Sequence, residues 1–227
     1  MKTLLIAGNW KSNFTNRDAS KWVRDWNDKC QMTHVKLEKI RIVLFVPFTL
    51  LYFLKQEFHT RGLPMELGAQ DVSPYPEGAY TGEESARMIK ELAQWVLIGH
   101  SERRKYFHET DAELALEVEQ AKLSGLSVMY CVSEAGMPVP KGVDAIAYEP
   151  SWAIGTGKTE TSEHANEILQ KLLETSGVGR GLYGGSVTAQ NVGQFVSQPA
   201  ISGVLVGGAS LDLQSFIDII RAASSIG

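Results

Sequence analysis

The chain has 227 residues, of which 44% are hydrophobic and 21% are charged, and its formal net charge is −4. This composition is sufficient for a large buried core and argues against a disordered or fibrous protein. The acidic balance argues against DNA or RNA as a partner, because nucleic-acid-binding domains usually carry a basic stripe, and no apolar run approaches the roughly 20 residues that span a bilayer.

Short apolar runs alternate with longer amphipathic runs along the whole chain, a pattern that predicts repeated βα units. The first apolar run, residues 4–8, is followed by Lys11 without a small-residue cleavage site, so we expect a strand there and not a signal peptide. Further strands are expected at residues 42–46, 66–70, 95–98, 127–131, 144–148, 181–183 and 203–206. Eight such strands predict a closed (β/α)8 TIM barrel, formed by residues 1–227 as a single domain.

Helices are expected between these strands, at residues 18–28, 49–60, 188–197 and 212–223. Local helix-start signals predict further helices, with capping boxes at Thr110-x-x-Glu113 and Thr81-x-x-Glu84, and with Thr161 or Ser162 before another helix.

The segment between the fifth and sixth strands, residues 133–144, leaves no room for an ordinary helix. Gly136, Pro138, Pro140 and Gly142 would break one in any case. We therefore expect a barrel in which the helix between strands 5 and 6 is missing or reduced to a loop. The connection at residues 174–181 is also short, which accounts for a chain below the roughly 250 residues typical of the fold.

A doubly wound open sheet is the competing architecture, and it usually carries a glycine-rich turn after its first strand. The first turn here, Gly8-Asn9-Trp10-Lys11, lacks that pattern.

The two cysteines, Cys30 and Cys131, have neither the spacing of metal ligands nor the pattern of a disulfide framework. We therefore expect reduced thiols in a cytoplasmic protein, and no metal site.

Polar groups of different chemical character follow three of the predicted strands. Asn9 and Lys11 follow the first, His100 the fourth and Glu149 the sixth. Pro150 blocks both further strand pairing and a helical start, so Glu149 is expected at the point where an apolar strand emerges into a loop. An isolated lysine or histidine is more often structural than catalytic, but a barrel brings these strand ends onto the face that holds the active site.

Two glycine-rich turns follow the last two strands, at Gly184-Gly185-Ser186 and at Gly207-Gly208. Backbone N–H groups in such turns bind phosphate, and the loops after strands seven and eight are the usual phosphate site of such barrels. The Gly-rich segment at residues 155–159 does not indicate a nucleotide P-loop, because that pattern requires glycine where the chain has Trp152.

Six motifs stand in the chain in a fixed order: Gly-Asn-Trp-Lys, Ala-Tyr-Thr-Gly-Glu, Ile-Gly-His-Ser-Glu-Arg-Arg, Tyr-Glu-Pro-Ser-Trp-Ala-Ile-Gly-Thr-Gly-Lys-Thr, Tyr-Gly-Gly-Ser and Val-Gly-Gly-Ala-Ser-Leu. In these motifs and their order the chain resembles the triosephosphate isomerase family from residue 6 to residue 211. The resemblance implies interconversion of dihydroxyacetone phosphate and glyceraldehyde 3-phosphate by proton transfer through an enediolate, with no metal or organic cofactor.

The resemblance also implies a role for each polar residue, following the glutamate base and neutral histidine known for the family. Glu149 would move the carbon-bound proton, and His100 would polarise the carbonyl and move protons between the oxygens. Lys11, supported by Glu102, would offset the negative charge, and Asn9 would donate a hydrogen bond to the reacting oxygens.

The phosphate clamp of the family corresponds to the backbone amides of Gly155, Ser186, Gly207 and Gly208. Residues 150–159 correspond to a lid, which Tyr183 and Ser186 would hold closed.

The third loop, residues 70–83, is longer than an ordinary βα loop, and in the family it inserts into a neighbouring subunit. The resemblance therefore implies a homodimer with Thr81 at the contact. Where the fifth helix is missing, we expect Met137 and Val139, or a second dimer, to cover the barrel.

Two rival functions are weighed against the isomerase. A catalytically silent barrel that binds phosphorylated sugars would keep the glycine turns and lose one of Lys11, His100 or Glu149, whereas all three are present. A Schiff-base aldolase would require a lysine where the sixth strand ends in glutamate.

Overall fold

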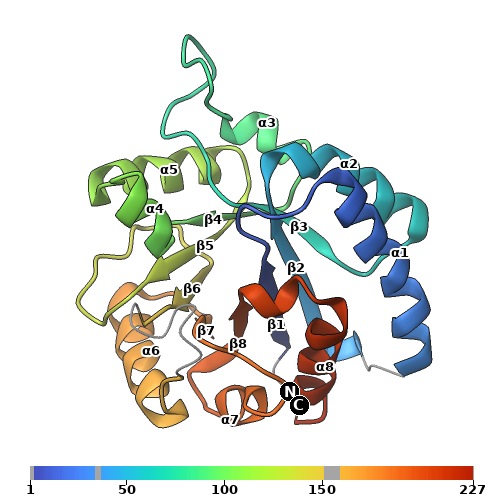
Figure 1. Cartoon of the computed structure of the whole chain (residues 1–227). Helices are drawn as coiled ribbons and strands as arrows, with labels where there is room; N and C mark the ends of the chain where they lie inside the picture. The colour runs from blue at the N-terminus through green and yellow to red at the C-terminus, as the bar shows by residue number, and fades with distance from the viewer. Residues whose placement is uncertain (1–2, 34–36, 151–158, 227) are drawn as a thin grey trace.

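The computed structural model describes residues 3–33, 37–150 and 159–226. Its strands pair in parallel in chain order and β8 pairs with β1, which closes the barrel (Figure 1). The strands are β1 (Leu4–Asn9), β2 (Ile40–Val46), β3 (Glu66–Ala69), β4 (Trp95–Ile98), β5 (Ser127–Val132), β6 (Ala145–Tyr148), β7 (Gly181–Tyr183) and β8 (Ile201–Val206). The predicted (β/α)8 TIM barrel is confirmed.

Helices surround the barrel on the outside (Figure 1). They are α1 (Asn16–Thr33), α2 (Phe48–Arg61), α3 (Ala86–Lys90), α4 (Ser101–Tyr106), α5 (Asp111–Leu123), α6 (Ser162–Ser176), α7 (Val192–Val196) and α8 (Leu213–Ser224), with short 3-10 turns at Leu37–Lys39 and Gly208–Ser210. Among the described residues, no helix combines the length and the hydropathy needed to cross a bilayer.

Side chains alternate along each strand between two buried layers. In β1, Leu4 and Ile6 join the layer beneath the helices, whereas Leu5 and Ala7 join a separate cluster inside the barrel. The interior cluster consists of Leu5, Ala7, Val43, Phe45, Trp95, Leu97, Met129, Cys131, Ala145, Ala147, Leu182 and Leu205. The barrel is therefore a packed core that holds the strand ends rigidly in place.

The connection between β5 and β6 contains no helix, as predicted; residues 133–144 are all described. Met137 and Val139 of this connection are partly buried and pack against the hydrophobic core. This contact agrees with the expectation that the two side chains cover part of the barrel wall.

The helix-start signals had different outcomes. Thr110 forms the predicted capping box with Glu113, and Thr161 accepts the N–H of His164 at the start of α6. The prediction that a helix starts at Thr81 was wrong, because α3 begins at Ala86 with Ser85 as its N-cap.

The loop around Thr81 has its own backbone closure, which explains that error. The Ser73 N–H donates to the Glu84 carbonyl at 3.0 Å, and the Glu83 N–H donates to the Tyr80 carbonyl at 3.0 Å. Thr81 is therefore held in a turn, and its loop projects beyond the helices at the top of Figure 1.

The predicted helix at residues 188–197 is shorter than expected. The Asn191 side chain accepts the Thr188 N–H at 2.8 Å and donates to the Ser186 carbonyl at 2.9 Å. These side-chain bonds hold a turn where the first helical turn was expected, and α7 begins at Val192.

Candidate active site

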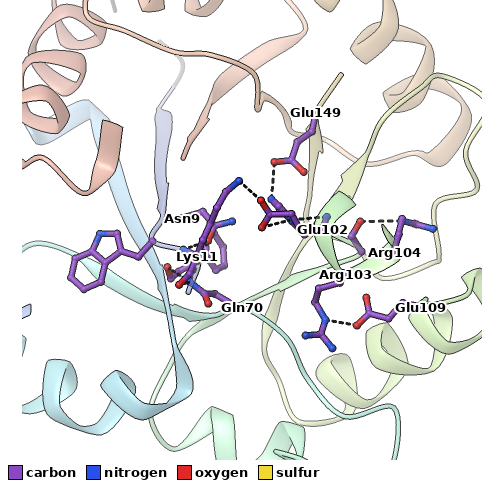
Figure 2. Close-up of polar contacts among 12 residues, drawn as sticks. Asn9, Lys11, Gln70, Glu102, Arg103, Arg104, Glu109 and Glu149 are labelled. Atoms are coloured by element: carbon purple, nitrogen blue, oxygen red, sulfur yellow. Dashed lines mark hydrogen bonds and ion pairs between the residues drawn. The ribbon is translucent and has the colours of Figure 1, made fainter. Parts of the chain in front are cut away.

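The four predicted catalytic residues converge at the carboxyl ends of the strands. Asn9, Lys11, His100 and Glu149 line one cavity of about 240 Å³. Figure 2 shows Asn9 and Lys11 at the end of β1 and Glu149 at the end of β6. Side chains far apart in the sequence therefore share one solvent-accessible site.

Lys11 is held in an unusual backbone conformation, with φ of 51°. Its N–H donates to Asn9 Oδ1 at 2.9 Å, and its carbonyl accepts from Gln70 Nε2 at 3.0 Å. A left-handed conformation costs a non-glycine residue about 1–2 kcal/mol, and such strain concentrates at functional sites. The predicted contact with Glu102 is present, since Lys11 Nζ donates to Glu102 Oε1 at 2.6 Å (Figure 2).

His100 is the N-cap of α4, and its Nδ1 accepts the backbone N–H of Glu102 at 3.2 Å. An imidazolium ring has no lone pair on Nδ1, so this bond favours the neutral ring with its proton on Nε2. Nε2 lies 3.3 Å from Glu149 Oε1, and only 5% of each side chain is exposed. The neutral His100 ring therefore directs its Nε2–H toward the Glu149 carboxylate, at the cavity.

The pKa values of this pair are set by burial and by the partner's charge. Burial raises the pKa of Glu149, but the His100 ring and the Lys11 ammonium outweigh burial and hold that pKa below its usual range. Burial lowers the pKa of His100, but the Glu149 carboxylate outweighs it and raises that pKa, while the Nδ1 contact opposes protonation. Glu149 is thus ionised at neutral pH.

Glu149 is seated by backbone bonds from both neighbouring strands. Its N–H donates to the Val132 carbonyl at 2.8 Å, and the Gly184 N–H donates to the Tyr148 carbonyl at 2.8 Å. Gly184 has to be glycine, because a Cβ there would lie 2.6 Å from Glu149 Cγ. In the described part of the chain, the buried Oε2 of Glu149 has no hydrogen-bond partner.

The predicted phosphate-binding turns line the same cavity as the catalytic residues. Ser186, Gly207 and Gly208 line it together with the catalytic residues. The predicted lid spans residues 150–159, and its residues 151–158, Gly155 among them, lie outside the described residues.

Comparison of the sequence with known protein families identifies the family to which the chain belongs. A model of the triosephosphate isomerase family matches residues 4–223. The chain belongs to the triosephosphate isomerase family.

Curated relatives named triosephosphate isomerase match nearly the whole chain. The protein from Synechococcus sp. strain JA-3-3Ab is 39% identical over 97% of this chain and 95% of its own length. The protein from Synechocystis sp. strain PCC 6803 is 41% identical over 97% of this chain and 99% of its own. That from Dehalococcoides mccartyi strain BAV1 is 38% identical over 100% of this chain and 98% of its own.

Tyr183 contacts the segment that follows the predicted lid. Its hydroxyl accepts the Glu160 N–H at 3.1 Å, and Tyr148 Oη lies 3.4 Å from Glu160 Oε2. Both tyrosines therefore hold Glu160, directly after the predicted lid.

The sequence analysis assigned no role to Cys131, which lies beside the triosephosphate isomerase site. Its thiol is buried and free, and it interacts with the Glu149 carboxylate. Burial raises the pKa of the Cys131 thiol well above its ordinary value, so the group stays neutral. Its place in β5, next to β6, is visible only after the strands are paired.

An acidic cluster behind α4 also escaped the sequence analysis. Among the described residues, oxygens of Asp71, Glu109 and Glu117 lie within 4.8 Å of one another, a spacing that could suit a metal ion. Arg103, however, forms an ion pair with Asp71 at 2.6 Å. It also forms an ion pair with Glu109, which Figure 2 shows. We therefore interpret this acidic cluster as a charge network that ties α4 to the loop after β3 and to the segment before α5.

Proposed function

We propose that the chain interconverts dihydroxyacetone phosphate and glyceraldehyde 3-phosphate through an enediolate, with Glu149 as the base. Glu149 takes the proton from the carbon next to the carbonyl, and the electron pair of that C–H bond forms the C=C bond of the enediolate. His100 moves the hydroxyl proton of that same carbon to the former carbonyl oxygen. The new C=O bond then forms at that carbon, and the electron pair of the C=C bond takes the proton back from Glu149 at the former carbonyl carbon. The observation that carries this proposal is the buried, ionised carboxylate of Glu149 at the wall of the cavity that the glycine turns also line.

The carbonyl oxygen takes up negative charge as the C–H bond breaks, and His100 is the proposed donor to it. The Nε2–H of the neutral ring points toward the carboxylate side of the cavity, and the α4 N-terminus fixes that tautomer. The Lys11 ammonium offsets the charge of the enediolate and the phosphate. Asn9, whose Oδ1 accepts from Lys11 N, leaves its amide N–H groups for the substrate oxygens.

Phosphate binding is assigned to the backbone N–H groups of Gly155, Ser186, Gly207 and Gly208. The family match supports this assignment for all four residues. Ser186, Gly207 and Gly208 also line the same cavity as Glu149. A Cβ on Gly208 would meet no atom of the described residues within 4 Å, so packing against them does not require glycine there.

The catalytically silent phosphate-sugar barrel is the less supported candidate. It has no need of a carboxylate that is 4% exposed, nor of a lysine held in a strained backbone. Burial of an ionised group is costly unless it is paired, so its retention at the cavity favours chemistry over binding alone.

Turnover of glyceraldehyde 3-phosphate by the purified protein, coupled to reduction of the product, tests the proposal. Glu149→Gln keeps the shape of the side chain and removes the base, so its kcat should fall about 10²- to 10⁴-fold. Glu119→Gln, on the exposed side of α5, is the matched control and should keep wild-type kcat. A folded wild-type protein without turnover would favour the silent barrel.

We further propose a single-domain cytoplasmic protein that forms a homodimer through residues 70–83. The loop carries a stacked aromatic pair, Tyr75 and Tyr80, with ring centroids 4.5 Å apart and 43% and 41% exposure. Thr81 is exposed beside them, and a cavity of about 190 Å³ next to Lys11 and Gln70 has room for one side chain from a partner's loop. Light scattering during gel filtration should give twice the chain mass; a fully active monomer would contradict the dimer.

A further inference from the structure

The connection between β5 and β6 folds one side chain back onto the barrel. Met137 Sδ accepts both the N–H and the hydroxyl of Ser133, each at 3.2 Å. The Met137 N–H donates to the Glu134 carbonyl at 3.4 Å, which makes a tight turn. The thioether is thus held over the carboxyl end of β5, on the side of the barrel where the outer helix is missing.

Beneath Met137 lies a small cavity of about 10 Å³ that Cys131 and Glu149 also line. Its other walls come from the ends of β4 and β5 and from α4. Beyond Ser133, the connection between β5 and β6 contributes Met137 to the lining. A space of this size is about the minimum that holds one water molecule. Glu149 Oε2 has no partner in the described residues, so a water entering here would find a strong acceptor.

We propose that Met137 is a positioning residue, which takes over the cover of the missing helix and keeps bulk water from the rear of the Glu149 carboxylate. The inference rests on the proposed function, because it concerns the base of that reaction. Met137 has the properties for this role, since methionine is flexible, apolar and able to fill irregular gaps.

The consequence of losing this cover follows from the solvation of the base. Burial is the largest influence on the pKa of Glu149 and raises it, whereas hydration would lower it. A less basic carboxylate removes a carbon-bound proton more slowly. The other charged or titratable groups that face it are His100, Lys11, Cys131 and Arg104, and the test leaves all of them unchanged.

The test compares Met137→Ser, which opens the cavity, with Met137→Leu, which fills a similar volume without the sulfur acceptor. Met88→Ser, at a side chain 51% exposed on α3, is the matched control. The first readout is the rate at which iodoacetamide alkylates Cys131, followed by peptide mass mapping so that Cys30 is counted separately. Met137→Ser should raise this rate about tenfold or more, while Met137→Leu and Met88→Ser stay near the wild type.

The second readout is the pH profile of kcat/KM together with kcat and KM. Met137→Ser should lower the acidic pKa of the profile and reduce kcat about 3- to 10-fold at nearly constant KM, since one pKa unit corresponds to a factor of ten. Met137→Leu should keep both. Should Met137→Ser fail to fold, Met137→Ala opens the same space and takes its place.

Each outcome either supports or overturns the proposed role of Met137. Unchanged alkylation of Cys131, or faster alkylation with unchanged kcat and pH profile, overturns the inference. If the wild type shows no turnover, the proposed function fails and the positioning role fails with it, while the alkylation rates separately decide whether Met137 seals the cavity.

Discussion

Replacing Glu117 by glutamine should remove a pH-dependent penalty on folding. Glu117 lies on α5 and is 3% exposed, and its Oε2 has no partner in the described residues. It belongs to the acidic cluster with Asp71 and Glu109, in which Arg103 ion-pairs with those two carboxylates. Glu117 is the carboxyl group of this cluster that Arg103 does not pair with, and we infer that it carries a proton at neutral pH.

The magnitude follows from the pKa difference between the folded and unfolded chain. Burial, followed by the negative charges of Asp71 and Glu109, raises the pKa of Glu117 from 4.5 to about 9. Between these values the folded protein holds a proton that the unfolded chain has lost, so the free energy of unfolding falls as pH rises. At about 1.4 kcal/mol per pH unit, this group costs up to about 3 kcal/mol between pH 4.5 and pH 7.

Urea unfolding at fixed protein concentration, followed by circular dichroism from pH 5 to pH 8, measures the effect. Glu117→Gln is neutral throughout, so its stability advantage over the wild type should be small at pH 5 and should increase by about 1 kcal/mol or more per pH unit. Glu119→Gln on the exposed face of the same helix should show no such trend. A difference that is independent of pH, or one that decreases as pH rises, would refute the reasoning.

Two further substitutions test the packing and capping described above. Gly203→Ala should destabilise the barrel by about 3 kcal/mol or more, or abolish folding, because its Cβ would lie 1.9 Å from the Leu5 carbonyl oxygen. Gly179→Ala is the control for the same urea titration and should fold normally, because none of the described atoms lies within 4 Å of its Cβ. Thr110→Ala removes the cap of α5 and should lower the free energy of unfolding by about 1 kcal/mol; an unchanged urea midpoint would show that the capping box contributes nothing.

The barrel could be predicted because its strands are buried on both faces and read as continuous apolar runs. β4 and β7 have the bounds that the sequence predicts, and the other strands differ by only one or two residues at their ends. The helices at Thr81 and at residues 188–197 were less predictable, because a local signal competes there with hydrogen bonds formed by the folded loop. A capping pattern covers only three or four residues, so it does not predict the hydrogen bonds that the folded loop forms instead of a helix.

The catalytic residues were predictable one by one because each follows a strand, and a closed barrel gathers strand ends by geometry alone. The groups around the catalytic residues could not be predicted in this way, because Cys131 and the acidic cluster belong to strands and helices that are distant in sequence. Their signal would be a buried polar residue on an otherwise apolar face, as Glu117 is on α5.

The short helix α4 shows how closely structural and catalytic contributions are combined. At its start His100 accepts the Glu102 N–H, and Glu102 in turn holds the Lys11 ammonium. The next residue, Arg103, pairs with the acidic cluster, and Arg104 donates to the Gly99 carbonyl and to Tyr130 Oη. Because one helix of six residues carries all these contacts, a shift of α4 would change the histidine tautomer, the lysine position and the cluster together. The acidic cluster therefore acts on the active site through the position of α4.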